Sequence, residues 1–457
     1  MMRLACFKGY DVRGRVGEEL TADTCRAIGR AFAAVMTPGT VVIGRDVRAT
    51  SEDFASALAE GLLESGVDVI DIGLCGTEEV YFATDHYGAG GGLMVTASHN
   101  PIDYNGIKLV GPGARPIPPA EGFQEIHDRV AAGAETPNGP RGTLRRENPR
   151  PAYVERVLSF IDPTALKGLK ILVNPGNGCA GPTFDAIAGA LAERGAEITF
   201  SRLHHTPDGS FPHGIPNPLL PENRPVTAES VKAETADFGV AWDGDFDRCF
   251  LFDETGSFID GEYLVGLLAT AFLGKVPGAK IVHDPRVMWN TQELVAAAGG
   301  EAVASLTGHV HVKAAMRRVD AVYGGEMSAH HYFRDFMYCD SGMIPWLLIA
   351  EHVCRTGQPL SALVGDRRVA FPSSGEINFR VTDPGAAMKA VEAAYAGAAP
   401  EIDRMDGLGL AFPDWRLNLR SSATEPVLRL NVETRGDRAA LETRTAEVTS
   451  LISAFAS

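Results

Sequence analysis

The sequence predicts an α/β protein of several domains that ends in a smaller α+β domain. A strand, a turn and a helix recur along most of the chain. The last part instead shows the alternating hydrophobic residues typical of antiparallel strands. The chain has 457 residues, which is more than one hydrophobic core usually holds. About three or four domains are therefore expected.

The first predicted domain spans residues 1–150. Ser51 is the expected N-cap of its amphipathic helix, because it directly precedes a run with helical hydrophobic spacing. The stretch 133–151 is rich in Pro, Gly and charge, so we expect a linker there. The elements follow the β-turn-α order: strands over 40–46, 67–72 and 92–96, and a helix over 51–65.

The second predicted domain spans residues 151–254. A strand over 169–174 leads through the glycine-rich turn 175–178 into a helix over 182–194. Such a turn before a helix can hold a phosphate, but it fits neither the Walker nor the dinucleotide fingerprint. We therefore expect a plain tight turn. By composition, the Pro-rich segment 204–225 is a linker.

The third predicted domain spans residues 255–367 and the fourth spans residues 368–457. The third again shows helix and strand patterns, whereas the fourth mixes alternating strands with two helices. The expected elements are helices over 263–273 and 291–298 with a strand over 279–283, and then strands over 377–381 and 428–432 with helices over 384–396 and 438–454.

Composition and charge exclude several classes of protein. The chain is 45% hydrophobic and 22% charged, with a formal charge of −16 and a pI near 5.2. This acidic balance argues against a nucleic-acid or anionic-membrane surface, so an anionic substrate must meet local clusters of Arg, Lys and metal. Seven scattered cysteines without a C-x-x-C pair, and a start that lacks a secretory segment, predict a cytoplasmic protein with reduced thiols.

Three carboxylates on alternate residues, Asp243, Asp245 and Asp247, form the first candidate site. In an extended segment they would project to one side, with Gly244 allowing a tight turn. Close carboxylates repel each other unless a cation joins them, and all-oxygen ligands favour a hard ion such as Mg²⁺. A solvated acidic loop and a Ca²⁺ loop are the alternatives, although the later glutamate of an EF-hand is missing.

Ser98 is the second candidate, and it follows the predicted strand 92–96. That strand would deliver the serine to the carboxyl end of a sheet, where open α/β folds bind ligands. Together with the acidic residues, Ser98 indicates phosphoryl transfer through a phosphoserine held by a divalent cation. An ordinary turn is the alternative. His99 is not automatically a base for the serine, because neighbouring strand residues face opposite ways.

Five segments, in order along essentially the whole chain, resemble the α-D-phosphohexomutase superfamily, and most closely its bacterial phosphomannomutases. The resemblance implies three similar α/β domains with mixed sheets and a smaller C-terminal α+β domain, arranged around a central active-site cleft. It also keeps 204–225 inside the second domain as a loop. The segments are Phe-Lys-Gly-Tyr-Asp-Val-Arg-Gly at 7–14, the Ser98 loop with 105–108, the Asp243 loop, 324–330 and 420–426.

The resemblance also implies catalytic roles. Ser98 would give and take the phosphoryl group and bind Mg²⁺ together with Asp243, Asp245 and Asp247. Lys108 would be a general acid or base, which requires a pKa lowered by desolvation or by nearby positive charge. An exposed loop lysine is the alternative. The remaining candidates for catalysis are Arg13 and Arg248 near the phosphate, and His99 and His309 as secondary groups.

Further residues are expected to bind the substrate. Glu326 and Ser328 would bind adjacent hydroxyls of a hexose, and His330 would contact phosphate or sugar. Arg286 stands where relatives often have a lysine near the sugar. The phosphate that is not reacting would be held by the loop of Arg420, Ser422, Ala423 and Thr424. The common form of this loop has Asn in place of Ala423, so one side-chain contact is lost.

The implied reaction interconverts mannose 1-phosphate and mannose 6-phosphate through a 1,6-bisphosphate and would supply GDP-mannose synthesis. Mg²⁺ and glucose or mannose 1,6-bisphosphate as activator are the expected cofactors. A hexose monophosphate is the expected partner, with no nucleic acid and no membrane, and the protein can be a monomer or a homodimer. The alternatives are a phosphoglucomutase or a dual-specificity phosphohexomutase, a Mg-dependent sugar phosphatase, and a non-catalytic sugar-phosphate sensor.

Overall fold

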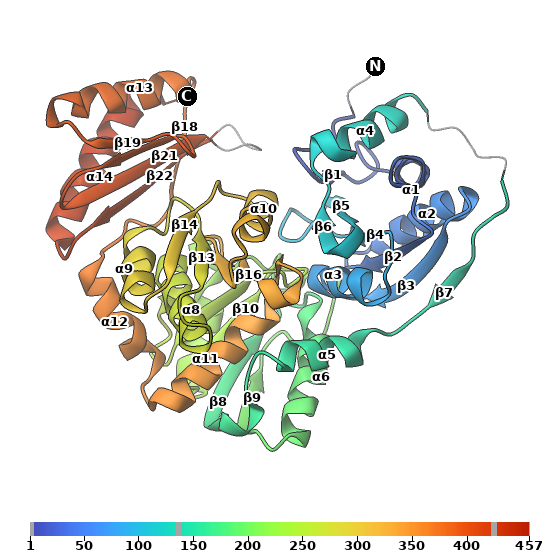
Figure 1. The fold of residues 1–457 in the computed structure, drawn as a ribbon, viewed down its shortest axis with the longest axis horizontal. Helices are drawn as coiled ribbons and strands as arrows, with labels where there is room; N and C mark the ends of the chain where they lie inside the picture. The colour runs from blue at the N-terminus through green and yellow to red at the C-terminus, as the bar shows by residue number, and fades with distance from the viewer. Residues whose placement is uncertain (1–3, 134–138, 422–426, 457) are drawn as a thin grey trace. The chain divides into compact units, whose positions relative to one another are not determined.

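The computed structural model describes residues 4–133, 139–421 and 427–456. The chain divides into two compact units, one formed by Met1–Phe258 with Ala329–Pro359, and the other by Ile259–Ser328 with Leu360–Ser457. Figure 1 shows the helices and strands of both units.

The first sheet of the first unit has the strand order β1-β5-β4-β2-β3-β7, with β6 paired to β5. Strands β4, β2, β3 and β7 are parallel, whereas β5 is antiparallel to both β1 and β4, so the sheet is mixed. Its strands are β1 Val12–Arg15, β2 Thr40–Arg45, β3 Asp68–Leu74, β4 Gly91–Val95, β5 Tyr104–Gly111, β6 Arg115–Pro116 and β7 Leu144–Arg146, and its helices are α1 Ala22–Met36, α2 Ser51–Glu64, α3 Thr77–His86 and α4 Phe123–Ala131.

Helices α1 and α2 pack closely because each has a glycine at the contact. A Cβ atom on Gly61 would lie 2.1 Å from the carbonyl oxygen of Arg26, and one on Gly29 would lie 2.4 Å from the carbonyl oxygen of Leu58. Only residues without a side chain allow the two backbones to come this near. The hydrophobic faces of these helices then cover the sheet and complete the core.

Two local expectations for this region are wrong. Ser51 is the first residue of α2 and not its N-cap, and its hydroxyl donates a hydrogen bond to Asp46 instead. The stretch 133–151 is more than a linker, because it contributes β7, which pairs in parallel with β3. The predicted strands and the helix over 51–65 are confirmed to within two residues at each end.

The second sheet of the first unit is also mixed, with the order β12-β11-β10-β8-β9. Strands β8, β9 and β10 are parallel, and β11 is antiparallel to β10. The segment 204–225 lies between β9 and α7. The remaining elements of the first unit are α5 Arg150–Leu158, β8 Lys167–Asn174, α6 Ala180–Glu193, β9 Glu197–Arg202, α7 Pro225–Ala233, β10 Phe238–Trp242, β11 Cys249–Asp253, β12 Phe258–Ile259, β16 His331–Phe333, β17 Cys339–Asp340 and α11 Met343–Thr356. Strands β16 and β17 pair with each other and are not part of this sheet.

The second unit contains a parallel part and an antiparallel part. Strands β14, β13 and β15 are parallel neighbours, and the strands of the C-terminal sheet, β18-β22-β21-β20-β19, are antiparallel throughout. Its elements are α8 Gly261–Lys275, β13 Lys280–His283, α9 Trp289–Ala297, β14 Glu301–Ala304, α10 His309–Val319, β15 Tyr323–Gly325, α12 Leu360–Ala370, β18 Ile377–Arg380, α13 Pro384–Tyr395, β19 Glu401–Asp403, β20 Leu408–Ala411, β21 Trp415–Ser421, β22 Val427–Thr434 and α14 Arg438–Ser453.

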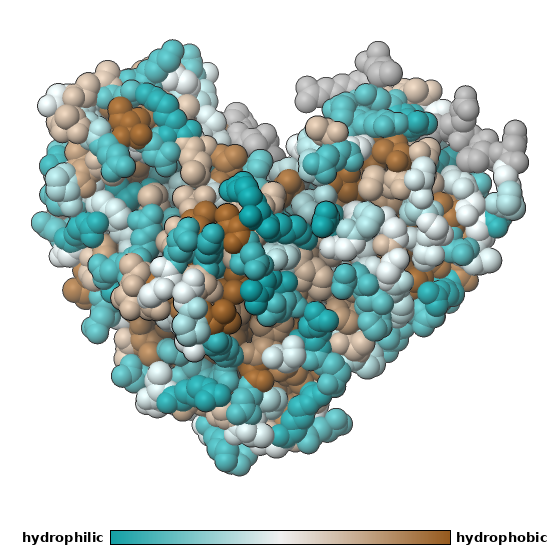
Figure 2. All heavy atoms as spheres, viewed as in Figure 1, coloured by the Kyte–Doolittle hydropathy of each residue, from teal (hydrophilic) through white to brown (hydrophobic). Residues whose placement is uncertain are grey.

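Hydrophilic side chains cover much of the face shown in Figure 2, and hydrophobic ones form separate patches between them. All seven cysteines lie within the described residues and are free thiols, six of them buried. Among the helices of the described ranges, none combines the length and the apolar character that crossing a bilayer requires.

Candidate active site

Ser98 lies in the turn that follows β4, in the first unit. Its backbone has a positive φ of 47°, which a non-glycine residue seldom adopts, so the surrounding contacts must hold this turn. The amide of Ser98 donates to the hydroxyl of Thr96 at 2.8 Å. Its Oγ donates to Asp243 Oδ2 at 2.6 Å and lies 3.0 Å from His99 Nδ1. The serine and the acidic loop therefore meet, although 145 residues separate Ser98 from Asp243.

Arg48 holds the backbone of this serine loop. One nitrogen of its guanidinium donates to the carbonyl oxygens of Ser98 at 3.0 Å and Asn100 at 2.6 Å. A second nitrogen donates to those of Pro101 and Tyr104, both at 2.9 Å. The arginine is buried, so water does not compete for these carbonyls. Sequence reasoning missed Arg48, although it lies just after the predicted strand over 40–46, and open α/β folds bind ligands at the carboxyl ends of such strands.

The acidic loop joins β10 to β11 and turns sharply. The expectation of an extended segment is wrong, because Phe246 has a φ of 45° and its amide donates to the carbonyl of Asp243 at 3.2 Å. The three carboxylates nevertheless converge: Asp243, Asp245 and Asp247 each offer an oxygen, and these atoms lie within 4.8 Å of one another. The turn, and not the alternation of an extended strand, therefore brings the carboxylates together.

Gly244 allows the serine loop and the acidic loop to touch. A Cβ atom at this position would lie 2.5 Å from the carbonyl oxygen of Ser98, which is too close for any side chain. The carbonyl of Gly244 accepts a hydrogen bond of 3.0 Å from the amide of Cys179, at the start of α6. The glycine was expected for its turn, and it is also needed for this close approach of two backbones.

The three aspartates fit a divalent cation. Oδ1 of Asp243 and Oδ1 of Asp245 are buried, and neither has a hydrogen-bond partner among the residues that the structure describes. A buried oxygen without a partner is costly, and a cation shared by the carboxylates would satisfy both atoms. Burial raises the pKa of Asp243 to about 6, with Asp247 and Asp245 adding to the rise and Arg248 opposing it. All of the donors are oxygen atoms, which hard cations prefer.

Lys108, on β5, holds the same carboxylates from the other side. Its ammonium donates to Asp245 Oδ2 at 2.7 Å, to Asp247 Oδ2 at 2.5 Å and to the hydroxyl of Thr77 at 3.1 Å. Although burial acts to lower its pKa, Asp245 and Asp247 raise it. The expected lowering of this pKa is therefore wrong for the arrangement seen here, in which the ammonium form is favoured. Thr77, which also donates to Asp245 at 2.6 Å, was not expected in the site.

Arg248 and His99 complete the surroundings of Ser98. Two nitrogens of Arg248 donate to Asp243 Oδ2, at 2.9 and 2.7 Å, and one of these nitrogens also contacts His99 Nδ1. Partial burial of the ring and the positive charges of Arg248 and Arg13 hold the pKa of His99 well below its usual range, so the imidazole is neutral at pH 7. Arg13 donates to Asn100 at 2.6 Å and to Asp11 at 2.9 Å, which ties β1 to the serine loop.

The structure places His330 beside the acidic loop. Its Nε2 lies 3.7 Å from Asp247 Oδ1, and His330 and Arg248 form an isolated β-bridge. Lys108 and His330 hold the pKa of Asp247 well below its usual range, against the effect of burial. His330 therefore joins the Ser98 cluster within the first unit.

The other expected substrate residues lie in the second unit. Glu326 accepts a hydrogen bond of 2.6 Å from the amide of Gly308, the residue before His309 at the start of α10. Arg286 pairs with Asp284, whose carboxylate also accepts from the amide of Met327 at 3.1 Å. The loops of Arg286, His309 and Glu326 are thus joined. Arg420, the second-last residue of β21, contacts Glu376 as Arg286 does, and the expected phosphate ligands Ser422, Ala423 and Thr424 lie outside the described residues.

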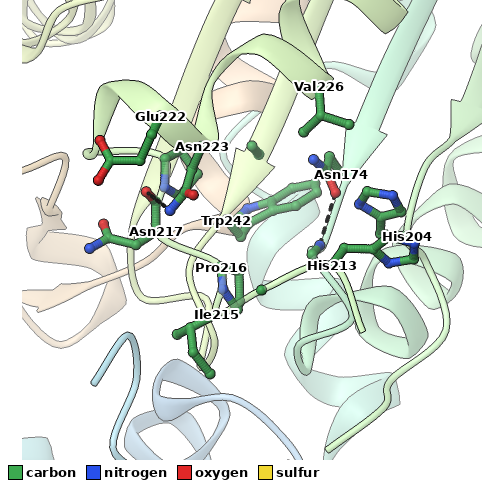
Figure 3. A pocket seen from close by; sticks show the side chains of 14 residues that line it. Asn174, His204, His213, Ile215, Pro216, Asn217, Glu222, Asn223, Val226 and Trp242 are labelled. Carbon is green, nitrogen blue, oxygen red and sulfur yellow. Dashed lines mark hydrogen bonds between the residues drawn. The ribbon is translucent and has the colours of Figure 1, made fainter. Parts of the chain in front are cut away.

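A separate pocket of about 310 Å³ lies at the carboxyl ends of β8 and β10, as Figure 3 shows. The rings of His204 and His213 stack on one side of it, with centroids 3.6 Å apart. Gly176, from the glycine-rich turn, and Trp242, which precedes Asp243, also line it. The turn 175–178 and the segment 204–225 therefore meet in the same part of the second sheet.

Four family models match the chain, one after another. They are described as phosphoglucomutase/phosphomannomutase alpha/beta/alpha domain I over residues 5–137, domain II over 151–256, domain III over 260–370, and the C-terminal domain over 376–451. A protein of Salmonella montevideo named phosphomannomutase is 58% identical, with 99% of this chain and 100% of that protein covered. The chain belongs to the phosphoglucomutase/phosphomannomutase family.

Two further relatives show how widely this family likeness extends. A Xanthomonas campestris protein named phosphohexose mutases is 57% identical over 99% of this chain and 100% of its own length. A crystal structure of a phosphoglucomutase/phosphomannomutase family protein from Burkholderia thailandensis has a TM-score of 0.88 at 32% identity, covering 99% of this chain and 98% of that one. The predicted fold class, α/β domains with mixed sheets and a smaller C-terminal α+β domain, is confirmed.

Proposed function

We propose that this protein is a phosphomannomutase that interconverts mannose 1-phosphate and mannose 6-phosphate through phospho-Ser98 and a 1,6-bisphosphate. The observation that carries the proposal is the hydrogen bond of 2.6 Å between Ser98 Oγ and Asp243, which joins a nucleophile to a buried carboxylate cluster. The relative from Salmonella montevideo supports mannose as the sugar, because its name is phosphomannomutase and its sequence matches over the whole chain.

Phosphoryl transfer depends mainly on positioning and charge neutralisation, and the residues around Ser98 suit both tasks. Arg48 fixes the loop backbone, so the Oγ atom keeps one position relative to the carboxylates. Arg248 and Lys108 bring positive charge to the same place. When bound by Asp243, Asp245 and Asp247, Mg²⁺ would add the charge that a phosphoserine requires.

Lys108 is a candidate for the acid role. Asp245 and Asp247 raise its pKa and so favour the ammonium form; a cation held by the same carboxylates would offset this attraction and make the proton easier to donate. The neutral imidazole of His99 lies 3.0 Å from Ser98 Oγ, but Arg248 contacts its nearer nitrogen. We propose that Lys108 holds the proton near the reacting oxygens, and that His99 and Arg13 orient the serine loop.

Substrate binding is proposed for the second unit. Glu326 and Ser328 would bind the sugar hydroxyls, with His309 and Arg286 close to them, and the loop of Arg420 would hold the phosphate that does not react. This assignment is supported by the joined loops of Arg286 and Glu326 and by the buried guanidinium of Arg420. After the first transfer the bisphosphate turns end for end, so these contacts must hold either of its phosphates.

A dual-specificity phosphohexomutase is the second candidate. It is favoured by the Xanthomonas campestris relative, which is 57% identical and is named for hexoses in general. Mannose and glucose phosphates differ at one hydroxyl, so the same contacts to phosphate and serine serve both sugars. A phosphatase would use the same carboxylates, but it would release free phosphate and would not need a bisphosphate.

Several finer assignments belong to the same proposal. We propose Mg²⁺ as the cation, glucose or mannose 1,6-bisphosphate as the activator, and supply of GDP-mannose synthesis as the use of the product. Seven free thiols suit a cytoplasmic location. We also propose domain boundaries after residues 150, 254 and 367.

The test measures turnover of mannose 1-phosphate and glucose 1-phosphate, each with and without Mg²⁺ and with and without added bisphosphate. Intact mass spectrometry of the same samples reports whether Ser98 carries a phosphoryl group. We expect hexose 6-phosphate to form without release of inorganic phosphate, and we expect a Ser98→Ala variant to form none. Stoichiometric release of inorganic phosphate would identify a phosphatase instead and would overturn the proposal.

A further inference from the structure

Three arginines of the second unit surround one carboxylate, that of Glu376. Arg286 lies 3.0 Å from Glu376 Oε2, Arg420 lies 3.4 Å from the same oxygen, and Arg429 lies 3.5 Å from Oε1. The three come from separate segments: the loop after β13, the end of β21 and the start of β22. Glu376 immediately precedes β18. The cluster is therefore built by four parts of the fold.

The strand register alone would make this cluster unfavourable. Arg420 and Arg429 are direct neighbours across the antiparallel pair β21–β22, and like charges placed opposite each other destabilise a sheet. The Glu376 carboxylate offsets this repulsion, and its pKa is lowered because Arg286, Arg429 and Arg420 outweigh the effect of burial. The carboxylate is thus ionised at neutral pH and lies against all three guanidinium groups, of which Arg286 is also paired with Asp284.

The cluster still has capacity for another anion. Arg420 is 8% exposed, and its Nε has no hydrogen-bond partner among the residues that the structure describes. Burial lowers the pKa of Arg420, and Arg286 and Arg429 lower it further, whereas Glu376 and Asp406 oppose them. Arg286 is already engaged by Asp284, at 2.5 Å, as well as by Glu376. Arg420 therefore keeps one buried guanidinium nitrogen that none of the described residues engages.

We infer that Glu376 is a built-in competitor of the phosphate at this cluster, and that it limits how tightly the phosphate is held. The inference rests on the proposed function only in identifying the anion as the non-reacting phosphate of a hexose phosphate. A phosphate at Arg420 would share the guanidinium groups with Glu376 and would meet the charge of its carboxylate. The binding of each phosphate is thereby weakened by the negative charge of the Glu376 carboxylate, which stays in the site.

A moderate affinity of the arginines for phosphate is useful for the proposed reaction. A bisphosphate that turns end for end must release one phosphate from the arginines before the other can take its place. The same three arginines without the Glu376 carboxylate would hold a dianion more strongly and would slow this exchange. Glu376 is a positioning residue in this account: it orders the arginines and sets their affinity, and it touches no reacting atom.

The test uses the full chain and the Glu376→Gln variant, which keeps the shape of the side chain and removes its charge. Inorganic phosphate is titrated by calorimetry in the presence of EDTA, so that the acidic residues near Ser98 repel it. We expect the dissociation constant of phosphate to fall by about tenfold in Glu376→Gln. In turnover assays, KM and kcat for the hexose phosphate should fall together, because the arginines bind the phosphate more tightly and release it more slowly.

Matched variants separate charge from shape and place. Glu376→Asp keeps the charge and should leave phosphate affinity within about twofold of the wild type. Glu392→Gln removes the same charge from an exposed pair with Arg404, at 2.7 Å, and should change nothing. Arg420→Gln should abolish phosphate binding and thereby show that the titration reports on this cluster.

Weaker phosphate binding in Glu376→Gln would overturn the inference, because it would mean that the carboxylate only holds the arginines in place. Failure of that variant to fold would overturn it for the same reason. If Arg420→Gln binds phosphate as well as the wild type does, the cluster is not the anion site and the inference is also wrong. None of these outcomes depends on isomerisation, so the proposed reaction at Ser98 is tested separately.

Discussion

Replacing Arg48 with lysine should impair catalysis without removing any group that touches the substrate. The guanidinium of Arg48 donates four hydrogen bonds, to the carbonyl oxygens of residues 98, 100, 101 and 104. Lysine keeps the positive charge opposite Asp46, which lies 3.6 Å from Arg48, so Arg48→Lys does not leave that buried carboxylate without a counter-ion. A single ammonium cannot reach four carbonyls that a planar guanidinium bridges with two nitrogens.

The magnitude follows from the bonds that are lost. A hydrogen bond with a charged donor contributes about 1.5–3 kcal/mol, so losing two of the four weakens the loop by roughly 3 kcal/mol. The turn holds Ser98 at a positive φ, and this conformation depends on such contacts. If the Oγ atom moves by about 1 Å, turnover falls by about a hundredfold, because the reacting atoms lose their alignment.

The assay compares kcat, melting temperature and Mg²⁺ affinity in the Arg48→Lys variant. Arg45→Lys is the matched control. Arg45 is the last residue of β2, the strand that precedes Arg48, but it pairs with Glu52 and Asp71 and not with the serine loop. We expect kcat to fall about a hundredfold in Arg48→Lys and less than twofold in Arg45→Lys. A kcat within twofold of the wild type for Arg48→Lys, with normal folding, would refute the role assigned to this arginine.

Three further predictions concern single side chains. Ser98→Ala should abolish isomerisation while calorimetry still detects hexose phosphate binding; residual turnover would show that another group carries the phosphoryl group. Asp245→Asn should weaken Mg²⁺ binding by about tenfold or more in a direct titration, and an unchanged affinity would exclude Asp245 as a ligand. Burial, with Asp260 and Glu433 adding, raises the pKa of Glu262 from 4.5 to about 8, so the folded state holds a proton that the unfolded chain releases above pH 4.5. Stability is then lost as the pH rises toward 8, by up to about 5 kcal/mol, and Glu262→Gln should flatten the melting temperature between pH 5 and 8.5; equal slopes for both proteins would contradict this assignment.

Periodic segments of this chain could be predicted from the sequence because each depends on its own residues. The strand over 40–46 and the helix over 51–65 have regular hydrophobic spacing, and both are present within one residue of the expected bounds. The stretch 133–151 could not be predicted, because β7 is a three-residue edge strand whose exposed residues show no buried side. Its pairing with β3 depends on partners far away in the sequence.

The candidate site shows the same division. Ser98 and Asp243 could be found because a nucleophile after a strand and alternate carboxylates are chemical patterns in themselves. Arg48 and Glu376 carry no such pattern, since a single arginine or glutamate is usually a surface residue. Their importance appears only when four carbonyls converge on one guanidinium, or three guanidinium groups converge on one carboxylate. Convergence of this kind comes from the fold and not from neighbouring residues.

The protonation state of Lys108 could not be predicted from the sequence. Its expected role required a lowered pKa, and burial does act in that direction. Two carboxylates within 2.7 Å of the ammonium reverse the outcome, because their attraction exceeds the cost of burial. The same two carboxylates are the expected ligands of the cation, so the lysine and the cation draw on the same oxygens. The state of Lys108 therefore depends on how Asp245 and Asp247 are shared, which is a property of the assembled site.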